Sequence, residues 1–128
     1  MADSTLDKLV ALELAGNDFG FYWPKVDYIF DQIANESKEV QDAIADRESP
    51  IRIQEEIGDL LHAVISVCIF YGYNPLEILT NATSKYDKRL SCLKEVTYKN
   101  GLSNLHNESL ETKLAFWKEA KSMTDEAA

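Results

Sequence analysis

The 128-residue sequence has few of the residues that cross-link small domains, because it contains only two cysteines, Cys68 and Cys92. They form no Cys-x-x-Cys pair, which argues against a disulfide scaffold and against a structural zinc site. Cys68 lies within an apolar run and is interpreted as a small core residue. A chain of this length can bury a hydrophobic core without cross-links.

Basic residues are also scarce, since 13 Lys and Arg stand against 22 Asp and Glu and give a net charge of -9. A surface of this sign repels nucleic-acid backbones and anionic lipids, so we expect neither nucleic acid nor membrane as a partner. The longest apolar run, residues 60–71, is shorter than the ~20 residues that a membrane-spanning helix needs. Residues 1–7 contain no signal-peptide pattern, and the expected location is the cytoplasm.

Strand signals are absent as well, because no stretch alternates apolar and polar residues between turn pairs. Apolar residues recur instead at helical spacing, for example Val26, Phe30 and Ile33, and Pro and Gly stand at the expected helix ends. The sequence therefore predicts an all-α fold of about five helices in a single domain, residues 1–128. The expected helices cover residues 4–15, 24–45, 51–71, 75–99 and 109–123, and residues 124–128 are expected to fray.

Two apolar segments are predicted to be buried. Residues 17–22 are predicted to form a loop with buried aromatic rings, and these rings are interpreted as core and not as a surface that stacks on a base. Residues 60–71 are apolar on nearly every face of their helix, so neighbours must cover that helix on all sides. We infer that a second subunit covers it, the alternative being the central helix of a monomer.

Two pairs of acidic residues are the first candidates for chemistry. Glu36 and Glu39 lie three apart on the second expected helix, as do Glu56 and Asp59 on the third. Each pair therefore shares one helix face, and antiparallel helices can set the pairs opposite one another. Four carboxylates beside an apolar core repel one another unless a divalent cation binds them, and oxygen ligands favour Mg²⁺ or Mn²⁺. The alternative is a pair of ordinary solvated helix faces.

His62 follows Asp59 by one helical turn and raises the alternative of a carboxylate-bridged di-iron site. Such a site needs a Glu-x-x-His motif on each of two helices, and the second expected helix has none. We interpret His62 as a hydrogen-bonded core or interface residue.

Polar residues on the fourth and fifth expected helices form a second candidate group. Asn81, Lys85 and Arg89 are each four residues apart and so share a face, which is either solvated or a phosphate clamp. Trp117 and Lys121 repeat this spacing near the end of the chain, and the tryptophan is interpreted as an anchor for the last helix.

In their order along the chain, these segments resemble the MazG family of all-α nucleoside triphosphate pyrophosphohydrolases, particularly its catalytic C-terminal domain. The family signature, Glu-Glu-x-x-Glu followed after a spacer by Glu-x-x-Asp, corresponds here to residues 35–39 and 56–59. The other similar segments are residues 20–24, 81–89 and 109–121, so the resemblance covers about residues 20–121.

The resemblance implies a Mg²⁺-dependent enzyme that hydrolyses nucleoside triphosphates to the monophosphate and pyrophosphate. Because the expected ligands are carboxylate oxygens, Mn²⁺ is expected as a substitute for Mg²⁺. The hypothesis that combines this resemblance with the apolar third helix is a helical bundle assembled as a homodimer or homotetramer. Carried over by position, the metal-binding and catalytic residues are Glu36, Glu39, Glu56 and Asp59. The substrate-binding residues are Asn81, Lys85, Arg89, Trp117 and Lys121. Glu36 and Glu39 are both candidates for the general base.

Two positions depart from the family pattern. Asn35 replaces the first Glu of the signature, and an amide carries no charge and cannot act as a base. His62 stands where the family usually has Phe. Asn35 makes a non-catalytic MazG-like module, binding a nucleotide or a partner protein, the alternative to an enzyme. The sequence does not indicate the preferred base or sugar.

Overall fold

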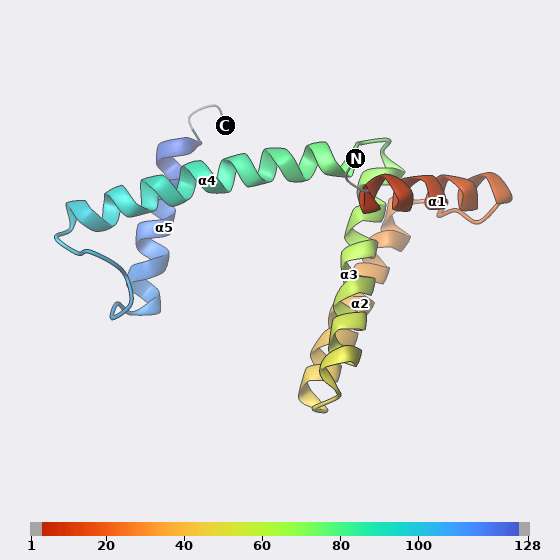
Figure 1. The fold of residues 1–128 in the computed structure, drawn as a ribbon, viewed down its shortest axis with the longest axis horizontal. Helices are drawn as coiled ribbons and strands as arrows, with labels where there is room; N and C mark the ends of the chain where they lie inside the picture. The colour runs from red at the N-terminus through yellow and green to blue at the C-terminus, as the bar shows by residue number, and fades with distance from the viewer. Residues whose placement is uncertain (1–3, 126–128) are drawn as a thin grey trace. The chain divides into compact units, whose positions relative to one another are not determined.

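The computed structural model describes residues 4–125, and these form five α-helices and no strand (Figure 1). The helices are α1 (Thr5–Phe19), α2 (Val26–Ala45), α3 (Pro50–Phe70), α4 (Pro75–Lys99) and α5 (Leu110–Thr124). The predictions of an all-α fold and of five helices are therefore confirmed. The chain divides into two compact units, Met1–Glu77 and Ile78–Ala128, and the prediction of one domain remains a prediction.

Side-chain caps explain where three of the helices begin. The hydroxyls of Ser4, Ser49 and Ser109 accept hydrogen bonds from backbone N–H groups three residues later, at 3.1 to 3.2 Å. Each bond satisfies an N–H group that the first helical turn leaves without a partner. In α3, Pro50 directly follows the capping residue Ser49. Proline has no backbone N–H and so leaves no donor without a partner at this position. The helix start predicted from Ser49-Pro50 is therefore confirmed.

The first helix is longer than predicted, and the expected end at Gly16-Asn17 is wrong. It continues to Phe19 and ends at Gly20, whose φ of 104° is a left-handed conformation that suits glycine. A glycine inside a helix costs only ~1 kcal/mol relative to alanine, so Gly16 alone does not stop the helix.

The aromatic rings at the end of α1 and directly after it are exposed, so the expectation that they are buried is wrong. Phe19 is 91% exposed and Phe21 is 79% exposed, while Trp23 stacks on Tyr28 with ring centroids 6.1 Å apart. The physical reason is that α1 has no buried residue. The rings at its end and in the following loop therefore have no hydrophobic core beside them in which they could be buried.

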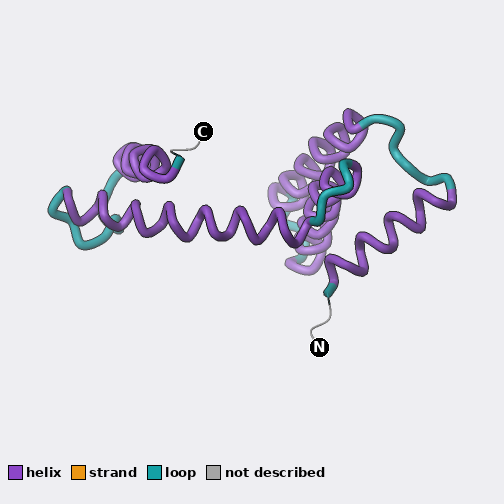
Figure 2. The backbone as a smooth tube through the Cα atoms, turned by 90° about the horizontal axis from the view of Figure 1, so that it is seen from above, coloured by secondary structure: helices purple, strands orange, loops and turns teal. Residues whose placement is uncertain are grey.

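The first unit is built on α2 and α3, which lie side by side and antiparallel and are joined by a short turn (Figures 1 and 2). Ile29 and Ala43 of α2 and Ala63 of α3 are almost fully buried. Phe30, one of the apolar residues that recur at helical spacing, remains 53% exposed, whereas its neighbour Ile29 is buried. This pairing brings the acidic residues of the two helices to the same place.

The apolar half of α3 is only partly covered. Leu61 is 59% exposed and Val64 is 48% exposed, so the other helices of the first unit do not surround this helix. Cover by a second subunit and a central position within a monomer both remain predictions. Among the described residues, no single helix is long and apolar enough to cross a membrane. Taken together, α3 and α4 reach the length and apolar composition of a membrane span, but they are sharply bent relative to one another.

In the second unit α4 and α5 cross (Figure 1). Side chains of the two helices are in contact with one another. The rings of Tyr86 and Trp117 lie 5.9 Å apart, in line with the interpretation of Trp117 as an anchor. Thr124 is the last residue of α5, so the expected fraying does not include it, and residues 126–128 lie outside the described part.

Candidate metal and nucleotide site

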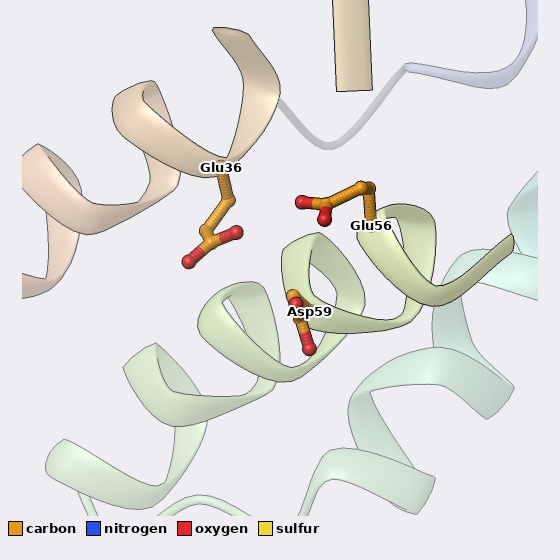
Figure 3. Close-up of side chains that lie close together, drawn as sticks. All are labelled: Glu36, Glu56 and Asp59. Carbon is orange, nitrogen blue, oxygen red and sulfur yellow. The ribbon is translucent and has the colours of Figure 1, made fainter. Parts of the chain in front are cut away.

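Acidic side chains from α2 and α3 meet in the first unit. Glu36, Glu56 and Asp59 each offer a carboxylate oxygen, and these three oxygens lie within 4.8 Å of one another. Glu36 comes from α2 and points toward Glu56 of α3 (Figure 3). The antiparallel pairing of the helices thus brings together three of the four acids expected from the sequence.

The fourth acid, Glu39, belongs to the same electrostatic group. A direct side-chain interaction with the Glu36 carboxyl and repulsion by the charge of Glu36 raise the pKa of Glu39 above its usual value. Burial and the charge of Asp59 raise the pKa of Glu39 further, while its side-chain interaction with Glu56 acts in the opposite direction. These interactions place Glu39 beside the other three acids, and together the four are called the acidic cluster below.

Glu56 is the most buried member of the acidic cluster, since its side chain is only 11% exposed. Burial raises the pKa of Glu56, and the charge of Arg52 opposes that rise. Nη2 of Arg52 donates a hydrogen bond of 2.8 Å to Oε1 of Glu56. This bond holds the Oε1 side of the carboxylate in place, whereas Oε2 on the other side takes no part in it.

Two oxygens of the acidic cluster are buried without a hydrogen-bond partner, Oε2 of Glu36 and Oε2 of Glu56. Leaving a buried charged oxygen unpaired is energetically costly, which a bound cation would relieve. The donor set consists of carboxylates alone, and hard oxygen donors suit hard divalent cations better than zinc or copper. The residues present therefore fit a divalent cation of this class.

His62 does not join the acidic cluster. Its Nε2 lies 2.7 Å from Oε1 of Glu13 on α1, and the hydroxyl of Ser66 donates to the same oxygen. His62 is hydrogen-bonded, as expected, but its side chain is 50% exposed, so the expectation of a core residue is wrong and that of an interface residue remains a prediction. Sequence reasoning missed Glu13 because its partners are 49 and 53 residues away, and no local spacing indicates such pairs.

A cavity of about 350 Å³ adjoins this hydrogen-bonded group. Its lining includes the rings of Tyr22 and Trp23 and the polar side chains of Asn17 and Gln32. Gln32 lies one turn before Glu36 on α2, so the cavity adjoins the helix face that carries the acidic cluster.

The basic residues expected to bind substrate lie in the second unit, where Arg89 pairs with the carboxylate of Asp125 and Lys85 and Lys121 act on it through their charges. Arg89 of α4 donates from Nη2 to Oδ1 of Asp125 at 2.6 Å. This hydrogen bond lowers the pKa of Asp125, and the charges of Arg89, Lys85 and Lys121 lower it further, against the effect of burial. Lys85, Arg89 and Lys121 are called the basic group below.

Sequence reasoning missed Asp125, because it lies in the segment that was expected to fray. The remaining predicted substrate residues are also in this unit, with Trp117 against Tyr86 and Asn81 exposed on α4.

Comparison with known proteins gives a consistent result. Residues 26–91 match the family model described as the MazG nucleotide pyrophosphohydrolase domain. A Thermotoga maritima protein named "Nucleoside triphosphate pyrophosphohydrolase/pyrophosphatase MazG" is 30% identical over 102 residues, which are 80% of this chain and 38% of that protein. An Escherichia coli K12 protein named "Nucleoside triphosphate pyrophosphohydrolase" is 27% identical over 106 residues, which are 80% of this chain and 39% of that protein.

A third relative, "Uncharacterized protein YabN" of Bacillus subtilis, is 36% identical over 69 residues, which are 54% of this chain and 14% of that protein. The chain thus spans less than two-fifths of the length of each of these relatives. The family match includes the acidic cluster together with Asn81, Lys85 and Arg89, and it ends before Trp117 and Lys121.

Proposed function

Because the chain belongs to the MazG nucleotide pyrophosphohydrolase domain family, we propose that it is a nucleotide pyrophosphohydrolase. It hydrolyses a nucleoside triphosphate, ribo or deoxy, between the α- and β-phosphates and releases the monophosphate and pyrophosphate. The observation that carries this proposal is the pair of buried, unpartnered oxygens that Glu36 and Glu56 contribute to the acidic cluster. The names of the T. maritima and E. coli relatives support the same activity.

The proposed cofactor is Mg²⁺, with Mn²⁺ as a substitute, held by Glu36, Glu39, Glu56 and Asp59. When bound, the cation supplies positive charge that offsets the charge of the phosphate oxygens. Arg52 keeps the carboxylate of Glu56 in a fixed orientation through its 2.8 Å hydrogen bond. Glu36 and Glu39 are the two candidates to accept the proton of the attacking water.

The basic group is proposed to hold the phosphate chain, with Trp117 and Asn81 completing substrate binding. The guanidinium of Arg89 offers a planar fork of donors that matches a phosphate, whereas Lys85 and Lys121 add point charges. Arg89 pairs with the carboxylate of Asp125, and the charges of Lys85 and Lys121 act on the same group, which supports a shared role of the three cations in binding an anion of the substrate. The substrate thereby meets positive charge in spite of the acidic surface of the chain.

We also propose that the chain assembles with copies of itself as a homodimer or homotetramer. The exposed apolar side chains of α3, among them Leu61, Val64 and Phe70, support this assembly. A helix with apolar residues on most faces gains stability when a second subunit covers it.

A product assay tests the proposed reaction. The chain is incubated with Mg²⁺ and each common ribo- and deoxynucleoside triphosphate, and the products are separated by anion-exchange chromatography. The proposal expects monophosphate and pyrophosphate from at least one substrate. Diphosphate with orthophosphate would place the cleavage at the wrong bond and contradict it.

Two variants with a matched control assign the activity to the acidic cluster. Glu56→Gln and Asp59→Asn are expected to lose turnover and to keep the helical circular dichroism of the original chain. The matched control is Glu55→Gln, which removes the same charge from the residue next to Glu56. The Glu55 side chain is 56% exposed, so this variant should retain activity. If Glu56→Gln turns over at the original rate, its assigned role is wrong.

The alternative function, a non-catalytic module, is favoured by one residue, Asn35, which replaces an acid of the family signature. It predicts tight nucleotide binding in the presence of Mg²⁺ with no product from any substrate. The di-iron alternative predicts bound iron and visible absorbance in the purified protein, which elemental analysis tests directly.

A further inference from the structure

The guanidinium of Arg89 already binds an anion that belongs to the chain itself. Its Nη2 donates to Oδ1 of Asp125 at 2.6 Å, and its Nε donates to the hydroxyl of Thr124 at 3.4 Å. The Arg89 side chain is only 18% exposed, and these two contacts use guanidinium N–H groups that a ligand would otherwise bind. They also join the end of α5 to the middle of α4 within the second unit.

The other two members of the basic group act on the same carboxylate. The pKa of Asp125 is lowered first by its hydrogen bond with Arg89, and the charges of Lys85 and Lys121 add to this effect. A negative group at this position is therefore stabilised by three cations from two helices. This is the environment that a phosphate group requires.

We propose that Asp125 is an internal competitor for the phosphate groups of the substrate, holding the place on Arg89 that a phosphate oxygen takes on binding. The inference rests on the proposed function for its assignment of phosphate to the basic group. A polyphosphate carries several negative charges against the single charge of Asp125, so it can displace the carboxylate from the three cations. Displacement frees the end of α5, and the contact forms again after product release.

A different role for Asp125 makes the opposite prediction. If the carboxylate positions Arg89 for phosphate binding, its removal weakens binding, because the guanidinium loses its orientation. If the carboxylate competes, its removal strengthens binding. The sign of the change therefore distinguishes the two roles.

Inorganic tripolyphosphate in the presence of a chelator is the probe, with binding measured by isothermal titration calorimetry. Without a divalent cation the acidic cluster repels this polyanion, so binding depends on the basic group and requires no hydrolysis. Asp125→Asn is expected to bind roughly three- to fivefold more tightly than the original chain, the size typical of removing one partly exposed charge. Unchanged or weaker binding would overturn the proposal.

Asp87→Asn is the matched control, because it removes the same charge from an exposed residue of α4. Asp87 lies two residues from both Lys85 and Arg89 and so faces away from their side of the helix. Its variant should bind tripolyphosphate nearly as the original chain does, and an equal gain would show a general charge effect that contradicts a specific competitor. Asp125 follows the last residue of α5, and circular dichroism verifies that its variant folds.

A double variant and a kinetic measurement complete the test. Adding Arg89→Gln to Asp125→Asn should abolish the gain in tripolyphosphate binding, and a gain that persists would refute the role of Arg89. In the product assay, Asp125→Asn should lower KM without lowering kcat. If no nucleotide is hydrolysed, the proposed function fails while the binding experiment still decides the role of Asp125. If nucleotide is hydrolysed and the gain is absent, only the competitor is wrong.

Discussion

The carboxylates of Glu36 and Glu56 face one another from two antiparallel helices, and each has one buried oxygen without a hydrogen-bond partner. Such an arrangement is unfavourable in the chain alone, because like charges in a partly dry environment repel one another. It becomes favourable when a cation is added. The acidic cluster should therefore link cation binding to the stability of the α2–α3 pair.

Cation binding is expected to raise the melting temperature of the chain, because a ligand that binds only the folded state stabilises it. At a free Mg²⁺ concentration 100 times the dissociation constant the gain is ~2.7 kcal/mol. Differential scanning fluorimetry with Mg²⁺, with Mn²⁺ and with a chelator measures this shift.

Glu36→Gln separates repulsion from cation binding in the same experiment. The variant should melt higher than the original chain in chelator, since one repelling charge is gone, and it should lose most of the Mg²⁺-dependent gain. Asp31→Asn, an exposed change on the same helix, is the control and should keep that gain. An unaltered response of Glu36→Gln to Mg²⁺ would argue against the assigned ligand.

The stability of the cation-free chain is expected to fall as the pH rises above the usual range of a carboxyl group. The pKa of Glu39 is raised by Glu36, and that of Glu56 is raised by burial, so between the unfolded and folded pKa values the folded state binds more protons. Stability must then decrease with rising pH over that window and recover as the pH falls toward the unfolded value.

Thermal melts in chelator between mildly acidic and neutral pH test this sign. The melting temperature should be higher at the acidic end, and Mg²⁺ should reduce the difference because the cation replaces the protons. Asp125, whose pKa is lowered by Arg89, contributes in the opposite direction, and its stabilisation is lost only at lower pH. A melting temperature that rises steadily toward neutral pH in chelator would contradict the prediction.

The sequence predicts the helices well because their signals are local. A capping serine before Pro50 and the spacing of Glu36 and Glu39 each involve a few neighbouring residues, and the structure agrees on both. To predict the acidic cluster, one more inference was needed, namely that α2 and α3 pair in antiparallel orientation. The short turn between the two helices favours this pairing.

What the sequence does not predict depends on distant residues. The contacts of Glu13 with His62 and of Arg89 with Asp125 join residues 49 and 36 positions apart, and no periodic pattern marks either pair. The exposure of Phe19 and Phe21 was mispredicted for a related reason, since burial depends on whether α1 finds a partner surface.

Restoring the usual family residue, His62→Phe, is expected to loosen α1 and to leave catalysis nearly unchanged. The substitution removes the hydrogen bond to Glu13, a loss of about 1 kcal/mol, while the acidic cluster keeps all its members. Hydrogen–deuterium exchange should show faster exchange in α1 and no change in α4 or α5. A loss of turnover with unchanged exchange would instead assign His62 to the reaction.

A charge on the exposed apolar face of α3 is expected to break the proposed assembly. Val64 is 48% exposed, and Val64→Glu would place a carboxylate among apolar side chains if a second subunit covers this face. Multi-angle light scattering should show an oligomer for the original chain and a smaller species for the variant. Ile51→Glu is the control, because Ile51 is 71% exposed near the start of α3, outside residues 60–71. A monomeric original chain would contradict the assembly, and equal disruption by both variants would place the interface elsewhere on α3.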